Sequence, residues 1–161
     1  MRYIEELKYT NITLDSIFRL YEWRFNIYRD KFLISKIPKI EEHILFINSE
    51  LRKENSHWFA YFEKTDKFKI PRIIGCSNLY DYSAHSSSIC FGRLMVDPSF
   101  TSIGIASKLT QYSIDFAKNK LHCKNINLIV KNSNHRAIKL YEKFGFELSV
   151  NDKVRSYTLK L

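Results

Sequence analysis

The sequence predicts a mixed α/β domain, and three observations lead to that prediction. Short apolar runs suited to strands alternate with longer segments in which apolar residues recur every three or four positions, as on a helix face. Hydrophobic residues make up 45% of the chain and aromatic residues 15%, which is enough to build a core. The 161 residues contain no internal repeat, low-complexity segment or interdomain linker. We therefore expect one domain that spans residues 1–161.

The N-terminal third predicts one strand and two helices. Residues 2–8 form a short opening strand, and Thr13 is suited to cap the helix that follows. The spacing of that helix places on one face Leu14, Ile17, Phe18, Tyr21 and Phe25. Residues 29–39 form a loop that contains Pro38 and leads into a second helix. The apolar face of the second helix is expected to carry Ile40, Ile44, Ile47 and Leu51.

The middle third predicts three strands. Residues 57–63 are rich in aromatic side chains, which favour a strand. Residues 64–71 are expected to turn, and residues 72–80 form the next strand. After a polar loop at 82–88, the apolar run at 89–96 predicts a buried strand.

The C-terminal third predicts two helices and three strands. A helix follows Gly104, and its apolar side is expected to carry Ile105, Leu109, Tyr112 and Phe116. Residues 126–130 form a short apolar strand, and a compact helix over 134–144 ends at Gly145. Residues 146–150 and 155–161 form two final strands, so the expected order is βααβββαβαββ.

Composition and charge exclude several classes of protein. The net charge of +9 would suit a nucleic acid or an anionic small molecule. Because the basic residues are dispersed and no nucleic-acid-binding motif occurs, we expect no specific nucleic acid partner. No segment predicts a membrane span or a signal peptide, so we expect a cytoplasmic protein with no membrane partner. Three scattered cysteines predict no disulfide framework, and the histidine and cysteine spacing predicts no metal site.

The segment Asp-Pro-Ser-Phe-Thr-Ser-Ile-Gly-Ile-Ala-Ser at 97–107 raises the question of a phosphate site. The first N–H groups of a helix have no partner within the helix and lie at the positive end of its dipole. Gly104 and Ala106 would let an anion approach these donors, and Ser102 and Ser107 could add hydroxyl groups. An ordinary turn would produce the same pattern. The spacing matches neither a dinucleotide-binding glycine motif nor an NTPase phosphate loop.

Two segments resemble signatures of the GCN5-related N-acetyltransferase (GNAT) family. The segment VDPSFTSIGIASKL is similar to that family's acetyl-CoA-binding strand, loop and helix. About thirty residues later, NHRAIKLYEKFGFE resembles its second signature, Asn-x-x-Ala-x-x-Leu-Tyr-x-x-x-Gly-Phe. The order of elements fits the family over almost the whole chain. The resemblance implies a mostly antiparallel central sheet flanked by about four helices, and transfer of an acetyl group from acetyl-CoA directly to a primary amine.

The resemblance also implies where the co-substrate binds. The backbone of Leu94, Met95 and Val96 would pair with the pantetheine arm, and Asn134 would contact the cofactor or cap its helix. The pyrophosphate would lie on the loop and helix start formed by Thr101, Ser102, Ile103, Gly104, Ile105, Ala106 and Ser107. Thr101, Ser102 and Ile103 depart from the usual Arg or Gln, Gly and basic residue of the family. Binding would therefore depend on backbone amides rather than on these side chains.

By the same resemblance, Tyr141 is the acid that donates a proton to the departing sulfur. A phenol with a pKa near ~10 is protonated at neutral pH and can respond when charge develops on a thiolate. The alternative is that Tyr141 is a core aromatic residue, because Ala137, Tyr141 and Phe144 share a helix face.

The base and the acceptor are less defined. The strand at 89–96 has no carboxylate that could act as a base. Asp81 and His85 in the preceding polar segment are either bases or exposed turn residues. Water could instead remove the amine proton. We expect the acceptor where the N-terminal half covers the sheet, near Trp23, Arg24, Tyr28, Arg29 and His85. Trp23 and Phe32 could instead be core residues.

The acceptor would be a small-molecule amine. The segment ISKIPKIEEHILFI is similar to the branch of the family that acetylates nucleotide-linked amino sugars or ribosomal-protein termini. A protein N-terminus, a polyamine or an antibiotic amine are alternatives, as is a non-catalytic CoA-binding regulatory module. The state of assembly is expected to be a monomer or a homodimer.

Overall fold

The protein contains one sheet of seven strands in the spatial order β1-β2-β3-β4-β5-β7-β6. The computed structural model describes residues 1–26, 31–66 and 68–161. Within these residues the strands are β1 (Arg2–Leu7), β2 (His57–Thr65), β3 (Phe68–Ser83), β4 (Ser88–Val96), β5 (Asn125–Lys131), β6 (Glu147–Asn151) and β7 (Val154–Lys160). Among the neighbouring pairs described, β4 and β5 run parallel and the other pairs are antiparallel. The predicted mixed, mostly antiparallel sheet is confirmed.

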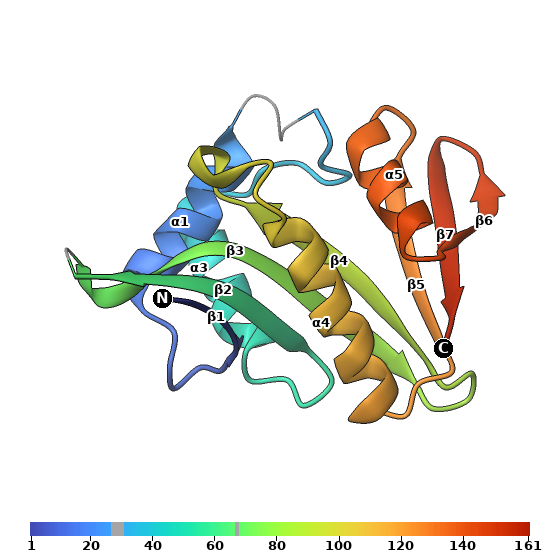
Figure 1. Ribbon diagram of the computed structural model, residues 1–161, viewed down its shortest axis with the longest axis horizontal. Coiled ribbons are helices and arrows are strands. Elements are labelled where there is room, and N and C mark those ends of the chain that lie inside the picture. Colours follow the sequence, from blue (N-terminus) through green and yellow to red (C-terminus); the bar gives the residue numbers. More distant parts are fainter. Residues whose placement is uncertain (27–30, 67) are drawn as a thin grey trace.

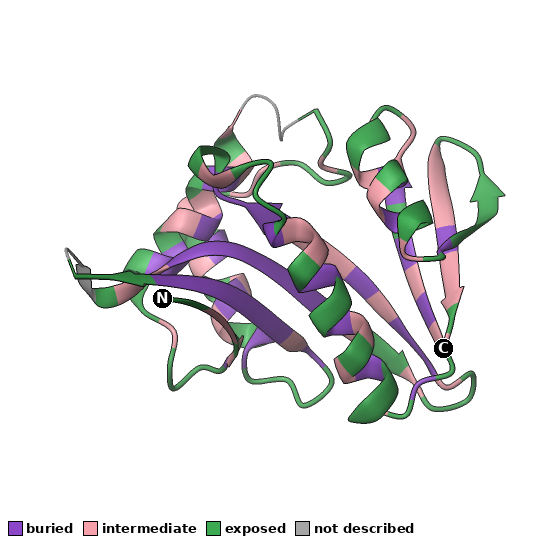
Figure 2. Ribbon diagram, in the orientation of Figure 1, coloured by how far each residue is buried: buried purple, intermediate pink, exposed green. Residues whose placement is uncertain are grey.

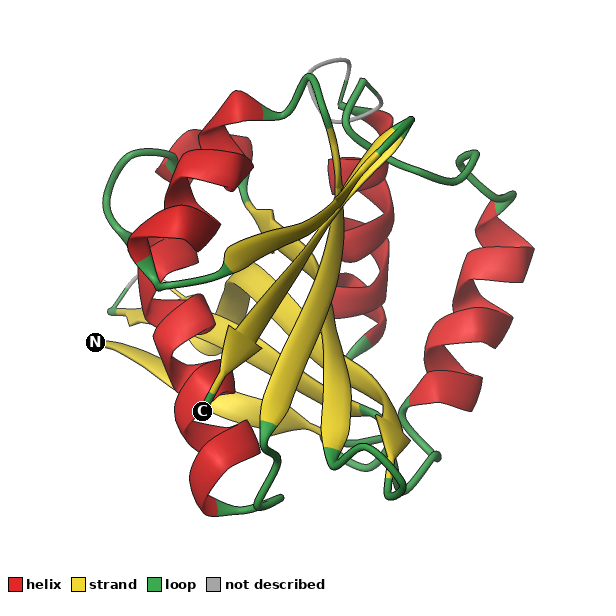
Figure 3. Cartoon of the chain, turned by 90° about the vertical axis from the view of Figure 1, so that its right-hand side faces the viewer, coloured by secondary structure: helices red, strands yellow, loops and turns green. Residues whose placement is uncertain are grey.

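Helices cover both faces of this sheet. They are α1 (Leu14–Phe25), α3 (Ile40–Glu50), α4 (Ile105–Asn119) and α5 (His135–Lys143), and a short 3-10 turn, η1 (Pro98–Phe100), precedes α4. Helices α4 and α5 lie on one face and α1 and α3 on the other (Figures 1 and 3). Each pair of helices encloses its own apolar cluster against the sheet. The order of helices and strands agrees with the sequence prediction.

The burial of the strands shows where the two clusters meet the sheet. Strands β2 and β3 are buried along most of their length, whereas β6 at the far edge is exposed (Figure 2). Trp58 and Phe59 are neighbours in β2 and lie in different clusters, so β2 contributes to both cores by alternation. The sheet therefore separates two interiors, and its faces can serve different purposes.

Local signals in the sequence explain where α1 begins and where α5 ends. Thr13 caps α1, and its side chain accepts a hydrogen bond from the Ser16 N–H at 3.1 Å. Gly145 follows α5 with a φ of +85°, and the Phe146 N–H donates to the Tyr141 carbonyl at 3.1 Å. This is the bond that closes a helix at a left-handed glycine. Both ends were predicted from the sequence.

The predicted turn at 64–71 was wrong. Strand β2 continues to Thr65 and β3 already starts at Phe68. Pro71 is tolerated there because the β2–β3 register shifts between Glu63 and Thr65, and β4 joins β3 only from Gly75 onward. The missing N–H of this proline therefore breaks no ladder pair.

Three predicted helix faces differ from the observed ones. In α1 the predicted face was wrong, because Leu14, Phe18 and Phe25 are exposed and the buried residues are Ser16, Ile17, Leu20 and Trp23. In α4 the most buried positions are Ile105, Leu109, Thr110, Ser113 and Ala117, and Tyr112 is 37% exposed. In α3 the buried side includes His43 and Glu50 beside Ile47. Apolar spacing alone could not identify these faces, because small and polar side chains occupy them. None of the described helices has the length and apolar character needed to span a membrane.

Candidate active site

Strands β4 and β5 pair over a short stretch and then separate. Their parallel ladder runs over Ser88–Cys90 and Asn125–Asn127. Beyond it β4 continues along β3, while β5 continues along β7 to Lys131. Figure 1 shows the two strands diverging toward the end where α4 begins and α5 lies. Beyond Cys90, the β5-facing edge of β4 could pair with an extended ligand. Pairing of Leu94, Met95 and Val96 with the pantetheine arm stays a prediction.

A β-bulge in β4 accompanies this separation. Cys76 pairs with Met95 and Asn78 pairs with Gly92, so β4 has one more residue than β3 between the two pairs. Arg93 lies at this position with a φ of +51°, a conformation that costs a non-glycine residue about 1 kcal/mol or more. Bulges bend and twist a strand, which turns the end of β4 away from β5. The sequence analysis missed the bulge, although a glycine inside an apolar strand is a signal for one.

The backbone around Gly104 offers a row of unused donors. Among the described residues, no amide N–H from Thr101 to Ser107 has a hydrogen-bond partner, and the ladder of α4 starts with the Lys108 N–H on the Gly104 carbonyl at 3.0 Å. Ser102 and Gly104 have φ values of +69° and +82°. A Cβ added to Gly104 would meet no protein atom within 4 Å, so the space above the helix start is open. This geometry suits a polyphosphate.

A second glycine positions the start of α4. Gly75 in β3 pairs with Val96, the last residue of β4. A Cβ at Gly75 would lie 2.7 Å from Cγ2 of Ile105, the first residue of α4. The glycine therefore allows the first turn of α4 to lie directly against the end of β4. The sequence analysis did not identify this role, because the contact is between distant segments.

Tyr141 lies on the inner side of α5. It is 8% exposed, and its ring contacts Phe91 of β4 at 6.1 Å and Phe146 at 5.9 Å between centroids. Burial raises the pKa of Tyr141 well above its ordinary value, so the hydroxyl remains protonated. Among the described residues, that hydroxyl has no hydrogen-bond partner. Tyr141 is therefore both a core aromatic and an available proton donor beside β4.

Asn134 caps α5 and retains a free amide group. Its Oδ1 accepts a hydrogen bond from the Ala137 N–H at 3.2 Å. Within the described part of the chain, its Nδ2 makes no hydrogen bond. The predicted cap is confirmed, and the amide nitrogen could also donate to a ligand.

The predicted acceptor residues are dispersed. Trp23 is 4% exposed and packs in the cluster beneath α1 and α3, while the half-buried Arg24 follows it on α1. Tyr28 and Arg29 lie outside the described residues. His85 is exposed in the turn between β3 and β4, and the start of β4 after this turn is already roughly 16 Å along the strand from the bulge. The structure therefore brings Trp23 and Arg24 toward the sheet, and it does not bring His85 to the open edge of β4.

Asp81, the other residue considered as a base, lies at the end of β3. It is exposed, and it lines a cavity of about 340 Å³ together with Glu50, Lys53, Asn55, Ser56 and Tyr80. This cavity opens on the α3 side of the sheet. The sequence analysis named none of its other residues.

The open edge of β4, the free amides and Tyr141 adjoin one another. The open edge of β4 leads from the free amides at 101–107 to the bulge, and the Tyr141 ring contacts β4 at Phe91, two residues before the bulge. An acyl donor with a phosphate at one end and an extended arm would fit this path. Helices α4 and α5 cover one face of the sheet, and α1 and α3, near which the sequence predicts the acceptor, cover the other.

Comparison with known proteins agrees with this geometry. The family described as the Acetyltransferase (GNAT) family matches residues 17–146. The acetyltransferase PseH of Campylobacter jejuni is 24% identical over 136 residues, which cover 83% of this chain and 78% of that protein. Its structure in complex with acetyl coenzyme A has a TM-score of 0.72 and covers 98% of this chain and 99% of that chain. A spermidine N-acetyltransferase of Vibrio cholerae, in complex with CoA and spermine, has a TM-score of 0.78 at 17% identity and covers 98% and 95%.

Proposed function

The chain belongs to the GNAT acetyltransferase family and is an acetyltransferase, and from that premise we propose that residues 1–161 form one domain that transfers the acetyl group of acetyl-CoA to the primary amine of a small molecule. The observation that carries this proposal is the open edge of β4 beside the free amides at 101–107 and Tyr141. The presence of acetyl-CoA in the complex of PseH supports the choice of co-substrate.

The two ends of the co-substrate have separate binding elements. The amides from Thr101 to Ser107 would hold the pyrophosphate without help from basic side chains at 101–103, because those positions are Thr, Ser and Ile. The backbone of Leu94 and Met95 would pair with the pantetheine arm as an added strand. One N–H of this edge would face the thioester oxygen and stabilise the negative charge that develops there.

The reaction then needs one proton donor and one proton acceptor. The amine nitrogen forms a bond to the acetyl carbon, and the bond between that carbon and sulfur breaks. The Tyr141 hydroxyl supplies the proton that the departing thiolate takes up, and its raised pKa keeps that proton in place until then. The nitrogen loses a proton to water, because β4 carries no carboxylate, and the Tyr141 phenolate takes a proton back from water.

Two classes of acceptor are candidates. An amino sugar, free or linked to a nucleotide, is suggested by the similarity of the segment at 34–47 to one branch of the family. A polyamine is the second candidate, because a protein named spermine/spermidine N(1)-acetyltransferase from Bacillus subtilis is 27% identical over 70 residues, 44% of this chain and 46% of its own length. A cytoplasmic location fits three cysteines that are all free thiols.

An amine panel tests the proposal. The protein is incubated with acetyl-CoA and one amine at a time, and free thiol and acetylated product are measured, while calorimetry follows acetyl-CoA binding. We expect acetyl-CoA to bind and at least one small amine to be acetylated. Binding without turnover of any amine would favour a CoA-binding regulatory module, and failure to bind acetyl-CoA would contradict the whole proposal.

A further inference from the structure

Behind the β4 bulge, on the face covered by α1 and α3, four side chains form a closed ring of polar contacts. The Arg93 guanidinium donates to Oδ1 of Asn78, and Nδ2 of Asn78 donates to Oγ of Ser56 at 3.2 Å. The Ser56 hydroxyl donates to Oε2 of Glu50 at 3.2 Å, and Nη1 of Arg93 lies 3.6 Å from the same oxygen. Glu50, Ser56 and Asn78 are at most 5% exposed. The ring therefore holds the half-buried Arg93 side chain, which is 22% exposed, against buried partners.

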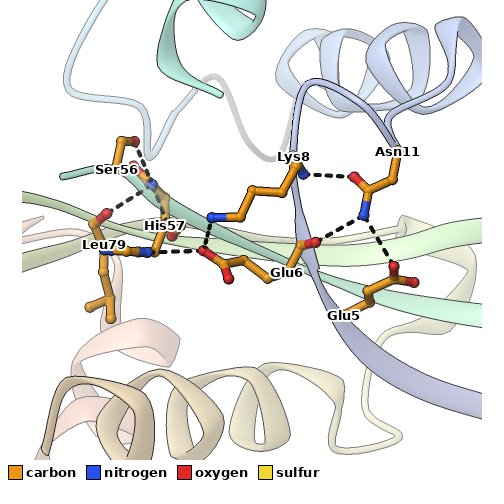
Figure 4. A network of polar contacts seen from close by, with 8 residues as sticks. Glu5, Glu6, Lys8, Asn11, Ser56, His57 and Leu79 are labelled. Atoms are coloured by element: carbon orange, nitrogen blue, oxygen red, sulfur yellow. Dashed lines mark hydrogen bonds and ion pairs between the residues drawn. The ribbon is translucent and has the colours of Figure 1, made fainter. Parts of the chain in front are cut away.

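The orientation of Asn78 is fixed from its other side. Its Nδ2 also lies within hydrogen-bond distance of the His57 and Leu79 carbonyl oxygens, each at 3.1 Å. Figure 4 shows Ser56, His57 and Leu79 together in this network, which extends through His57 to Glu6 of β1. Because these acceptors require the amide nitrogen, the amide oxygen must face Arg93. The guanidinium thus has a prepared acceptor.

Aromatic rings complete the surroundings of this guanidinium. The Cζ atom of Arg93 lies 4.4 Å from the ring centroid of Tyr80, 5.1 Å from that of Phe46 and 5.5 Å from that of Trp58. Aromatic faces around a carboxylate form the kind of site that binds ammonium ligands. In this protein the chain's own cation already occupies that site.

This cationic group lies at the acceptor side of the proposed reaction. Arg93 is the bulge residue itself, next to Leu94, and its side chain points to α3 rather than to α5. Glu50, Ser56 and Tyr80 line the 340 Å³ cavity and also belong to the surroundings of Arg93. An acceptor that enters from the α1 and α3 face would therefore meet the Arg93 environment.

The local charge balance on this face is positive. Glu50 is shared by two cations, Arg93 at 3.6 Å and Lys53 at 2.5 Å. Burial, and after it the nearby positive charge of Arg93, lowers the pKa of Arg24. Asp81 at the cavity rim is exposed, and exposed charges are weakened by solvent.

We propose that Arg93 is a specificity-determining residue that excludes acceptors bearing a second positive charge and selects monoamines whose other groups are uncharged or anionic. The inference rests on the proposed acetyltransferase function and favours an amino sugar over a polyamine as the acceptor. Its physical basis is that a second ammonium would have to approach a fixed guanidinium whose carboxylate partner is already engaged.

A pair of acceptors that differ in one charge tests the inference. 3-Amino-1-propanol and 1,3-diaminopropane have nearly the same size, and near neutral pH the second carries an extra ammonium. We expect the wild-type enzyme to favour the aminoalcohol by about tenfold or more in kcat/KM. Arg93→Met keeps a long apolar side chain over the aromatic rings and removes the charge, so this preference should shrink to about threefold or less, or reverse.

Arg52→Met is the matched control. Arg52 also lies over an aromatic ring, that of Tyr9 at 3.7 Å, and its loss changes the net charge equally outside the polar ring. This variant should keep the wild-type preference. A wild-type enzyme that acetylates both amines equally well, or an Arg52→Met variant that changes selectivity as much as Arg93→Met, would overturn the inference while leaving the acetyltransferase activity established. If Arg93→Met fails to bind acetyl-CoA, the ratio of kcat/KM for the two amines in the wild-type enzyme decides whether the inference holds.

Discussion

Replacing Tyr141 with phenylalanine separates the catalytic role of this residue from its structural one. The substitution removes a hydroxyl that has no hydrogen-bond partner among the described residues and keeps the ring contacts with Phe91 and Phe146. No hydrogen bond is lost, so the free energy of unfolding should change by less than about 0.5 kcal/mol. For a chain of this length that corresponds to a shift in Tm of about 2 °C or less.

The effect on catalysis should be much larger. A general acid contributes about 10²–10⁴-fold to the rate, or about 2.7–5.5 kcal/mol of the barrier. We therefore expect kcat of Tyr141→Phe to fall by that factor, with the acetyl-CoA Kd changed by no more than a few-fold. Because the pKa of Tyr141 is raised above 10.0, the proton stays bound as the pH rises, so wild-type kcat should show no loss from this group in the mildly alkaline range.

A second buried tyrosine supplies the control. The Tyr157 hydroxyl donates to Oε1 of Glu142 at 3.1 Å, and the residue is 1% exposed. Tyr157→Phe loses a real hydrogen bond, so it should lower stability by about 1 kcal/mol and leave kcat unchanged. Single-turnover acetyl transfer and thermal unfolding of both variants make the comparison. If Tyr141→Phe transfers acetyl groups at the wild-type rate, or if it is the variant that unfolds, the proton-donor role is refuted.

Three further predictions concern the glycines and His43. Gly104→Val should raise the KM for acetyl-CoA at least several-fold, because the valine side chain enters the space above the free amides. Gly145→Ala introduces the same backbone strain and should lower stability and kcat without raising that KM. Equal effects of the two substitutions on the KM would contradict the assignment of the phosphate site. Gly75→Ala should also raise the KM, since its Cβ would lie 2.7 Å from Cγ2 of Ile105, and the added substitution Ile105→Ala should recover most of the loss in calorimetric titrations. Burial lowers the pKa of His43 from 6.5 to about 4, so the imidazole takes up a proton more readily in the unfolded chain. The free energy of unfolding should keep this contribution above pH 6.5 and fall by about 3 kcal/mol as the pH drops to 4. Urea unfolding of His43→Phe should show a smaller pH dependence than wild type.

The fold was largely predictable because its signals are local. Periodicity gave the order of helices and strands, Thr13 and Gly145 marked helix ends, and the two signature segments indicated the family. The predicted turn at 64–71 was too long, because Thr65 lies in β2 and Phe68 already lies in β3. In the sheet, Pro71 falls where the register already shifts, and that depends on which strand lies beside it.

The site was only half predictable for the same reason. The amides after Gly104 and the tyrosine of α5 belong to continuous segments, so their pattern is visible in the sequence. The bulge at Arg93 and the contact of Gly75 with Ile105 exist only once β3, β4 and α4 are assembled. Asn78 is 22 residues from Ser56 and 15 from Arg93, and Glu50 lies on α3 whereas Arg93 lies on β4. Nothing in their local sequence indicates a shared network.

The two faces of the sheet would act on opposite charges, one by binding the anionic donor and the other by excluding a dicationic acceptor. The net charge of the whole chain favours both effects. On the α4 face, free amides at the positive end of a helix would attract the polyphosphate of the donor. On the α3 face, the half-buried Arg93 guanidinium in its aromatic site would repel a second ammonium on the acceptor. A net charge of +9 adds a long-range field of the same sign, which favours the approach of an anionic donor and disfavours a polycationic acceptor. Raising the salt concentration should therefore weaken acetyl-CoA binding and reduce the preference for monoamines over diamines. Part of this preference should persist, because the Arg93 charge is half-buried and is screened less than an exposed charge.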